Sequence, residues 1–197
     1  GEGVDQLKEV LRLLREEIET ARQLGMTAQL LARFASAGLA QSRERVALHD
    51  TLQSVLTHRK RETDAVGIAV QPGTPPVDVI VDASLMFSLL NTLIDWSLSR
   101  ARSSISLGVD IDPWKIHARL TCRFSTEPAD ATAPAPSLDS MSWRLLEQTA
   151  VTMQLGLSRQ VHDQAVTVTL EFALPTQTGI EGLSSIDLDK GFDSSIN

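Results

Sequence analysis

The chain has 197 residues, of which 42% are hydrophobic, and carries a formal net charge of -7. This acidic balance argues against general affinity for nucleic acid or anionic membrane. The single cysteine, Cys122, excludes an internal disulfide framework and a cysteine-rich zinc site. It lies in a strand-like run and is predicted to be buried. No signal peptide or membrane span is visible, so we expect a soluble, cytoplasmic domain with an appendage.

A long helix is predicted from Val4 to Arg45. Its first apolar residues alternate steps of four and three, the spacing of a coiled-coil seam: Leu7, Leu11, Leu14, Ile18 and Ala21. Gly25 interrupts this stripe, and one continuous helix is preferred over a hairpin because no proline or turn cluster accompanies the glycine. Such a helix cannot bury its seam alone, so we expect it to pack on the domain or to pair with a second copy.

A second helix is predicted to begin at Asp50, acting as N-cap, and to carry Leu52 and Val55 on its apolar side. It ends in the basic run 58–61, His-Arg-Lys-Arg. We interpret this run as a solvated helix end whose cations complement the helix dipole. A contact with phosphate or nucleic acid is the alternative.

The rest of the chain alternates between half-buried strands and amphipathic helices. In order, we expect strands at 67–70 and 77–81, a helix at 84–100, strands at 104–111 and 114–124, a loop at 125–136, a helix at 143–153 and a hairpin of strands at 155–161 and 165–174. Beyond Pro175 the composition is that of a tail or linker. The three tryptophans are expected in the core or at an interface: Trp96, Trp114 and Trp143.

This order predicts an α+β fold, a two-layer α/β sandwich with helices on one face of a mixed sheet and a long N-terminal helix. We divide the chain into a helical dimerisation-like segment at 1–47, the sandwich domain at 48–175 and a tail or linker at 176–197. Over residues 4–175 the order and local patterns resemble the ATP-binding domain of bacterial sensor histidine kinases, which belongs to the superfamily of gyrase, Hsp90 and MutL ATPases.

The resemblance is carried by the order and spacing of five patterns rather than by any single motif. They resemble the second helix of the kinase dimerisation hairpin, the linker into the catalytic domain, a strand-Asp-helix junction, the N-box (N-L-x-x-N-A) and the closing strand with its Leu-Pro. Their sequences are LLARFA at 30–35, RVALHDTL at 45–52, VDASL at 81–85, LLNTLID at 89–95 and TLEFALP at 169–175.

The resemblance implies a nucleotide site on the N-box helix. In that family the second N-box Asn binds the magnesium ion that bridges the ATP phosphates, and Asp95 replaces it here. A carboxylate can hold magnesium. Asn91 and Asp95 are four residues apart and share a helix face, which makes them a candidate vestigial cofactor site. The alternative is that they form the exposed side of an amphipathic helix.

Other positions depart from the family, because the chain has no glycine between Gly108 and Gly156. The family's D-x-G-x-G motif binds adenine, and its glycines let the backbone approach the nucleotide. The corresponding stretch, RFSTEP at 123–128, has neither that aspartate nor a glycine. The lid motif G-x-G-L-G supplies amides to the phosphates, and its counterpart is SLDSMSW at 137–143. We therefore expect that ordinary ATP binding is lost.

The family's phosphoacceptor histidine is missing as well, because no histidine precedes His49. The four histidines are expected to be ordinary surface or edge residues: His49, His58, His117 and His162. They show no shared metal-ligand spacing, so we predict neither a metal site nor a catalytic residue.

The leading hypothesis is a non-catalytic, histidine-kinase-like signalling module without a cofactor. It would dimerise through the first helix and act as a scaffold for another signalling protein, a response regulator or a kinase. One alternative is an ATP-independent histidine phosphotransferase. Another is an active sensor histidine kinase that uses ATP and magnesium under an unusual lid. Both alternatives need a phosphoacceptor helix upstream of this fragment. A different small ligand in the vacated pocket is a third possibility.

Overall fold

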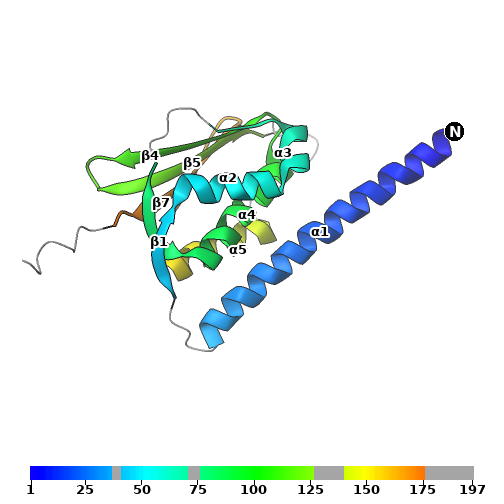
Figure 1. The fold of residues 1–197 in the computed structure, drawn as a ribbon. Helices are drawn as coiled ribbons and strands as arrows, with labels where there is room; N and C mark the ends of the chain where they lie inside the picture. The colour runs from blue at the N-terminus through cyan, green and yellow to red at the C-terminus, as the bar shows by residue number, and fades with distance from the viewer. Residues whose placement is uncertain (37–40, 71–75, 127–139, 176–197) are drawn as a thin grey trace, which may run out of the picture.

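The computed structural model describes residues 1–36, 41–70, 76–126 and 140–175. A sheet is covered on one face by helices, and a long helix extends past this domain (Figure 1). The helices are α1 (Glu2–Ser36), α2 (Leu48–His58), α3 (Lys60–Val66), α4 (Ala83–Arg100) and α5 (Met141–Met153). The strands are β1 (Arg43–Ala47), β2 (Ile68–Val70), β3 (Asp78–Asp82), β4 (Ile105–Asp112), β5 (His117–Ser125), β6 (Gly156–His162) and β7 (Ala165–Ala173).

The main sheet has five strands in the order β2-β4-β5-β7-β6. Only β2 and β4 pair in parallel, and the other neighbours are antiparallel. Leu120 pairs with Leu170, and Cys122 lies between Leu107 and Val168 in the register. These residues point to the same face because side chains alternate along a strand. The predicted mixed sheet with one buried face is therefore confirmed.

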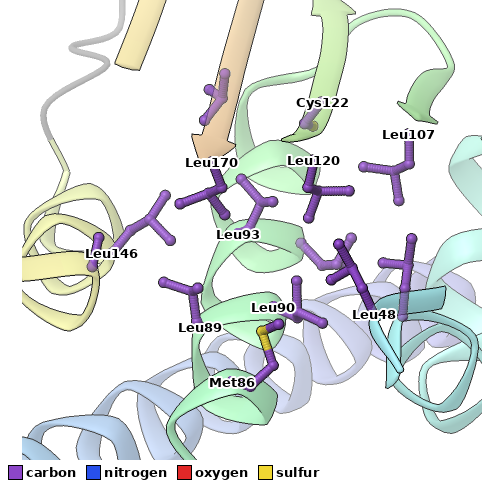
Figure 2. Close-up of a cluster of buried hydrophobic side chains, with 14 of the residues drawn as sticks. Leu48, Met86, Leu89, Leu90, Leu93, Leu107, Leu120, Cys122, Leu146 and Leu170 are labelled. Atoms are coloured by element: carbon purple, nitrogen blue, oxygen red, sulfur yellow. The ribbon is translucent and has the colours of Figure 1, made fainter. Parts of the chain in front are cut away.

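The core lies between this face and α4. Leu89, Leu90 and Leu93 of α4 are at most 1% exposed, and Figure 2 shows them beneath Leu120 and Leu170 of the sheet. Burying one such side chain contributes roughly 1.5–3 kcal/mol. The beginning of α4 is fixed by its N-cap, Asp82. Its Oδ1 accepts hydrogen bonds from the backbone N–H groups of residues 84 and 85 at 3.0 and 3.1 Å.

The prediction of one continuous helix through Gly25 is confirmed, but its predicted end is wrong. α1 ends at Ser36, and residues 43–47 form strand β1, which pairs antiparallel with β3. The Asp82 Oδ2 atom accepts a hydrogen bond from the Ser42 N–H at 3.0 Å, which anchors the start of this strand. The pairing satisfies backbone groups with a strand that is distant in the sequence, Arg45 opposite Ile80 for example, and this tertiary contact overrides local helix propensity.

The predicted N-cap of the second helix is also wrong. α2 begins at Leu48, and Asp50 lies inside its first turn. The preceding Ala47 has no side-chain capping bond, but the Leu48 N–H donates to the Val77 carbonyl at 2.9 Å. A backbone acceptor next to β3 therefore does the work of a cap, because the first amides of a helix need a partner from outside it.

The two halves of α1 have different surroundings. The second half packs against α4 and α5 through buried or half-buried residues at heptad-like spacing: Thr20, Leu24, Thr27, Leu31 and Phe34. The first half extends beyond the domain, and its side chains are exposed (Figure 1). In the described part of the chain, no helix combines the length and the apolar character that a bilayer crossing requires.

Candidate functional site

Asn91 and Asp95 lie on the buried side of α4. Asn91 is 4% exposed and Asp95 is 7% exposed, so the interpretation of this pair as an exposed polar helix face is wrong. Asn91 Nδ2 donates to the Phe87 carbonyl one turn earlier, at 3.0 Å. A buried carboxylate needs a compensating charge or hydrogen bonds, which raises the question of what faces Asp95.

The partner of Asp95 is Arg59, at the junction between α2 and α3. Its Nη2 forms an ion pair with Asp95 Oδ1, and its Nη1 donates to the Asn91 carbonyl at 3.1 Å. Its Nε donates to Glu62 Oε2 at 3.0 Å, so the guanidinium joins three acceptors. The side chain of Arg59 is 10% exposed. The interpretation of the basic run as one solvated helix end is wrong, because only His58 ends α2, whereas Lys60 and Arg61 are exposed residues that begin α3.

Two oxygen atoms of the pair remain without a partner. Asn91 Oδ1 and Asp95 Oδ2 are buried, and neither meets a hydrogen-bond donor in the part of the chain that the structure describes. Burial raises the pKa of Asp95, and the nearby Arg59 opposes this effect. The negative charges of Glu62 and of Glu19 on α1 raise the pKa further. Arg59 is therefore the cation that balances this acidic site.

An aromatic cluster surrounds Trp96, which follows Asp95 in α4. Trp96, the residue after Asp95, is fully buried. Its ring centroid lies 5.5 Å from that of Phe124 at an interplanar angle of 69°, and 4.8 Å from that of Trp143 at 46°. The Arg159 guanidinium carbon lies 4.3 Å from the centroid of the Trp143 ring. Core positions are thus confirmed for Trp96 and Trp143, whereas Trp114 is 93% exposed.

Of the stretches 123–128 and 137–143, the structure brings Phe124 and Trp143 into the aromatic cluster. Residues 123–125 end strand β5, and residue 126 follows the strand. Residues 127–139 lie outside the described residues. Ser140 Oγ accepts from the Trp143 N–H at 3.3 Å and caps α5. His49 and His117 are half-buried, and His58 and His162 are exposed. Within the described ranges, no three His, Cys, Asp or Glu residues are grouped as a metal site would require.

Cys122 is buried, as predicted from the sequence. Its Sγ lies 3.3 Å from the Ser97 Oγ of α4. Burial raises the pKa of the thiol to about 11. A protonated, inaccessible thiol is neither a nucleophile nor a metal ligand at neutral pH, so Cys122 is a packing residue.

Two cavities in the described part of the chain lie away from Asp95. One, of about 120 Å³, is on the outer face of β4 and β5 and is lined by residues such as Asp110 and Arg123. The other, of about 350 Å³, lies between α1 and α5 and is lined by Leu31, Ala32, Phe34, Ala35, Gln41, Gln148 and Thr152.

Sequence reasoning did not connect two residues with Asn91 and Asp95: Arg59, and Trp96, which was predicted only as a core or interface residue. Arg59 lies in a run of four basic residues, and nothing in the local pattern distinguishes it from its exposed neighbours. Its role depends on a partner 36 residues away. A signal for Trp96 was present, because the N-box pattern ends in a small alanine where this chain has its bulkiest side-chain type.

Comparison with known proteins shows which solved structures share this fold. No family model and no curated protein matches the chain. Among solved structures, the Acinetobacter baumannii histidine kinase AdeS matches with a TM-score of 0.65 at 12% identity, covering 84% of each chain. The cytoplasmic segment of histidine kinase QseC matches with a TM-score of 0.55 at 13% identity, over 79% of this chain and 95% of that one. A histidine kinase from Burkholderia phymatum gives 0.53 at 19%, over 84% and 81%. The chain therefore has the fold of the histidine kinase ATPase domain, preceded by a long helix.

Proposed function

We propose that this chain is a non-catalytic module of two-component signalling, which does not bind ATP and acts as a dimeric scaffold for another signalling protein. The observation that supports this proposal most strongly is the buried contact between the Arg59 guanidinium and the Asp95 carboxylate. The other support comes from the aromatic cluster around Trp96 and from the exposed seam of α1.

The first argument concerns the metal ion that accompanies ATP in the kinase family. The resemblance assigns the magnesium ligand to the position of Asp95. In this chain one oxygen of that carboxylate already contacts a guanidinium that is itself 10% exposed. A divalent cation at the same oxygen would stand within contact distance of a fixed positive charge, and repulsion is strong in a poorly solvated site. Arg59 therefore supports the loss of magnesium binding.

The second argument concerns space. Trp96 stands where the N-box pattern has alanine, and its ring contacts Phe124 at the end of β5 and Trp143 on α5. Close-packed interiors have no room for both such a ring and a ligand. The resemblance assigns adenine binding to the segment that begins at Arg123, directly beside Phe124. A packed aromatic core at this place supports the loss of nucleotide binding.

The scaffold role is supported by α1. Its first half exposes five large aliphatic side chains at coiled-coil spacing, each at least 52% accessible: Val4, Leu7, Leu11, Leu14 and Ile18. A helix face of this kind gains stability by pairing with another helix. We assign it to homodimerisation, and we assign the domain to contact with a response regulator or a kinase.

A phosphorylation assay tests the non-catalytic assignment. The full chain is incubated with a separate phosphoacceptor hairpin of a histidine kinase, because it has no histidine before His49, and with either magnesium and γ-labelled ATP or a phosphorylated response regulator. Acid-labile phosphate on both proteins is then measured. We expect no incorporation above a heat-denatured control. Stable phosphohistidine from ATP would support the active kinase instead, and label acquired only from the response regulator would support the histidine phosphotransferase.

Sedimentation equilibrium tests the dimer. Leu14→Glu places a charge on the seam, and Met26→Glu places one at a comparably exposed position away from it, since the two side chains are 52% and 53% exposed. We expect the parent chain and Met26→Glu to be dimeric and Leu14→Glu to be monomeric with an unchanged circular dichroism spectrum of the domain. A monomeric parent chain would contradict the scaffold proposal.

A further inference from the structure

Trp114 is the most exposed large apolar side chain in the described part of the chain, at 93%. The other two tryptophans, Trp96 and Trp143, are buried in the core. Tryptophan is highly buried in most proteins, and where it reaches the surface it is enriched at contacts with other segments or proteins. The Trp114 ring therefore indicates a contact surface whose partner lies outside the described residues.

The turn that carries Trp114 has a well-anchored backbone. Asp112 Oδ1 accepts hydrogen bonds from the N–H groups of Trp114 and Lys115 at 2.9 and 3.3 Å, and the Asp112 carbonyl accepts one from the Ile116 N–H at 2.9 Å. The Arg119 Nη1 atom lies 3.5 Å from Asp112 Oδ2. A turn that is held in this way loses little conformational entropy when a contact covers its indole ring.

The described part of the chain ends beside this turn. Ala173, the last residue of β7, pairs with His117, the first residue of β5. Glu171 of β7 also forms an ion pair with Lys115 of the turn, at 3.2 Å. Figure 1 shows the end of β7 and the turn between β4 and β5 at the same end of the sheet. The segment 176–197 is therefore attached to the domain close to Trp114.

This segment is long enough to reach Trp114. Paired antiparallel residues lie about 5 Å apart, and the chain from His117 to Trp114 spans at most about 11 Å, so Trp114 lies within about 16 Å of Ala173. The chain from Ala173 to Ile180 can span about 23 Å. Ile180 and the residues that follow it are therefore within reach of the Trp114 ring.

The sequence of the segment has a pattern typical of a short helix with one apolar side. Ile180, Leu183 and Ile186 recur every three residues and would share one side of a helix. Thr178 and Glu181 have the spacing of a capping box, which marks the start of a helix. A helix of this length is marginal in water unless its apolar side packs on another surface. The Trp114 ring would provide such a surface.

Charge favours this partner over a membrane. The segment 176–197 carries four acidic residues and one lysine, which give a net charge of -3. In the domain, Lys115 is paired with Glu171 at 3.2 Å and Arg119 with Asp110 at 2.5 Å, so these positive charges are balanced. An anionic membrane would repel the acidic end of the chain. The stretch 180–186 contains a single acid, Glu181, and its apolar contact with Trp114 needs no charge pairing.

We propose that residues 180–186 of this chain fold back onto the turn between β4 and β5 and cover the Trp114 ring with Ile180, Leu183 and Ile186. The contact is made within one chain. It is independent of the proposed function, because neither nucleotide binding nor the pairing of α1 enters the argument.

Acrylamide quenching of tryptophan fluorescence tests the contact in the full chain. The double variant Leu183→Asp with Ile186→Asp places two charges on the apolar side of the segment. The matched control, Phe192→Asp with Ile196→Asp, adds the same charge outside the stretch 180–186. Trp114→Phe, combined with each variant, identifies the signal of Trp114, because the other two tryptophans are buried in the core. Each chain is measured over a series of protein concentrations.

We expect little quenching of the parent chain and of the control variant. Leu183→Asp with Ile186→Asp should gain an accessible component that corresponds to one of the three tryptophans and that disappears with Trp114→Phe. An accessible Trp114 in the parent chain overturns the inference, and so does a double variant that is quenched like the parent chain or like the control. Protection that is lost on dilution would assign the contact to a second copy and also overturns it. None of these results bears on nucleotide binding or on the oligomeric state that sedimentation measures.

Discussion

At the scale of single residues, the most distinctive feature of this domain is the ion pair between Arg59 and Asp95. Their side chains are 10% and 4% exposed, so both charges have lost most of their hydration. For buried pairs the cost of desolvation can equal or exceed the attraction between the charges. The raised pKa of Asp95 has the same cause, because burial outweighs the effect of the guanidinium. Removal of one partner is therefore expected to lower the free energy of unfolding strongly, whereas replacement of both partners by apolar residues is expected to change it little.

Removing one partner should destabilise the chain far more than removing both. We expect Arg59→Ala to lower the free energy of unfolding by about 3 kcal/mol or more, because it leaves Asp95 buried without a cation. The double variant Arg59→Met with Asp95→Leu should stay within about 1 kcal/mol of the parent chain. Urea denaturation measures both, with the exposed Arg61→Ala as control. Equal losses for Arg59→Ala and Arg61→Ala would show that the pair is not buried in solution.

Cys122 gives a prediction about reactivity. Its thiol is buried against Ser97, and its pKa is raised to about 11, so the folded chain holds no appreciable thiolate at pH 8. Thiol reagents attack the thiolate. We expect labelling by a colorimetric thiol reagent at pH 8 to be complete within minutes in denaturing urea and to proceed in buffer only as fast as the chain unfolds. Rapid labelling of the folded chain would refute the buried position.

The turn between β4 and β5 contains a residue with a strained backbone conformation. Asp112 Oδ1 accepts from the backbone N–H groups of Trp114 and Lys115 at 2.9 and 3.3 Å, and these bonds lower the pKa of Asp112. The turn closes with Ile116 at a φ of 54°, the left-handed region that a β-branched residue rarely adopts. Ile116 is 69% exposed, so little packing repays this conformation.

Replacing Ile116 by a residue that accepts a positive φ should therefore stabilise the chain. We expect Ile116→Asn to raise the free energy of unfolding by about 1 kcal/mol, since the left-handed conformation costs ordinary residues roughly 1–2 kcal/mol and asparagine less. The same substitution at Ile111, which lies within β4, should lower stability and serves as the control. Urea midpoints for the two variants check both signs. A destabilised Ile116→Asn would mean that the side chain is buried by a contact in solution.

Elements with a local signal were predictable from the sequence, and those that depend on distant partners were not. α4 and the hairpin of β6 and β7 follow from periodicity and turn residues, and they begin and end within two residues of the predicted bounds. β1 was missed because it pairs with β3, which is distant in the sequence, and because its own sequence continues a helical pattern. The same reason hid Arg59, whose contact with Asp95 exists only once α2 and α4 are packed together.

The whole molecule combines the histidine kinase ATPase fold with an interior that departs from the family pattern. The residues that the resemblance assigns to the N-box lie in α4, where Asp95 is paired with Arg59 and Trp96 is packed against Phe124. A fold does not by itself imply a function, which depends on the groups at the site. The proposed function follows from these groups, together with a long helix whose apolar face remains exposed.

Isothermal titration calorimetry of the full chain with magnesium-ATP tests the central claim most directly. We predict no saturable heat up to millimolar nucleotide, and no rise in the unfolding temperature at the same concentrations. A kinase-like site would bind in the micromolar range, and at ~100 times its dissociation constant the nucleotide would stabilise the fold by about 2.7 kcal/mol. Saturable micromolar binding with that stabilisation would contradict the proposal and would require Arg59 to release Asp95 when nucleotide binds.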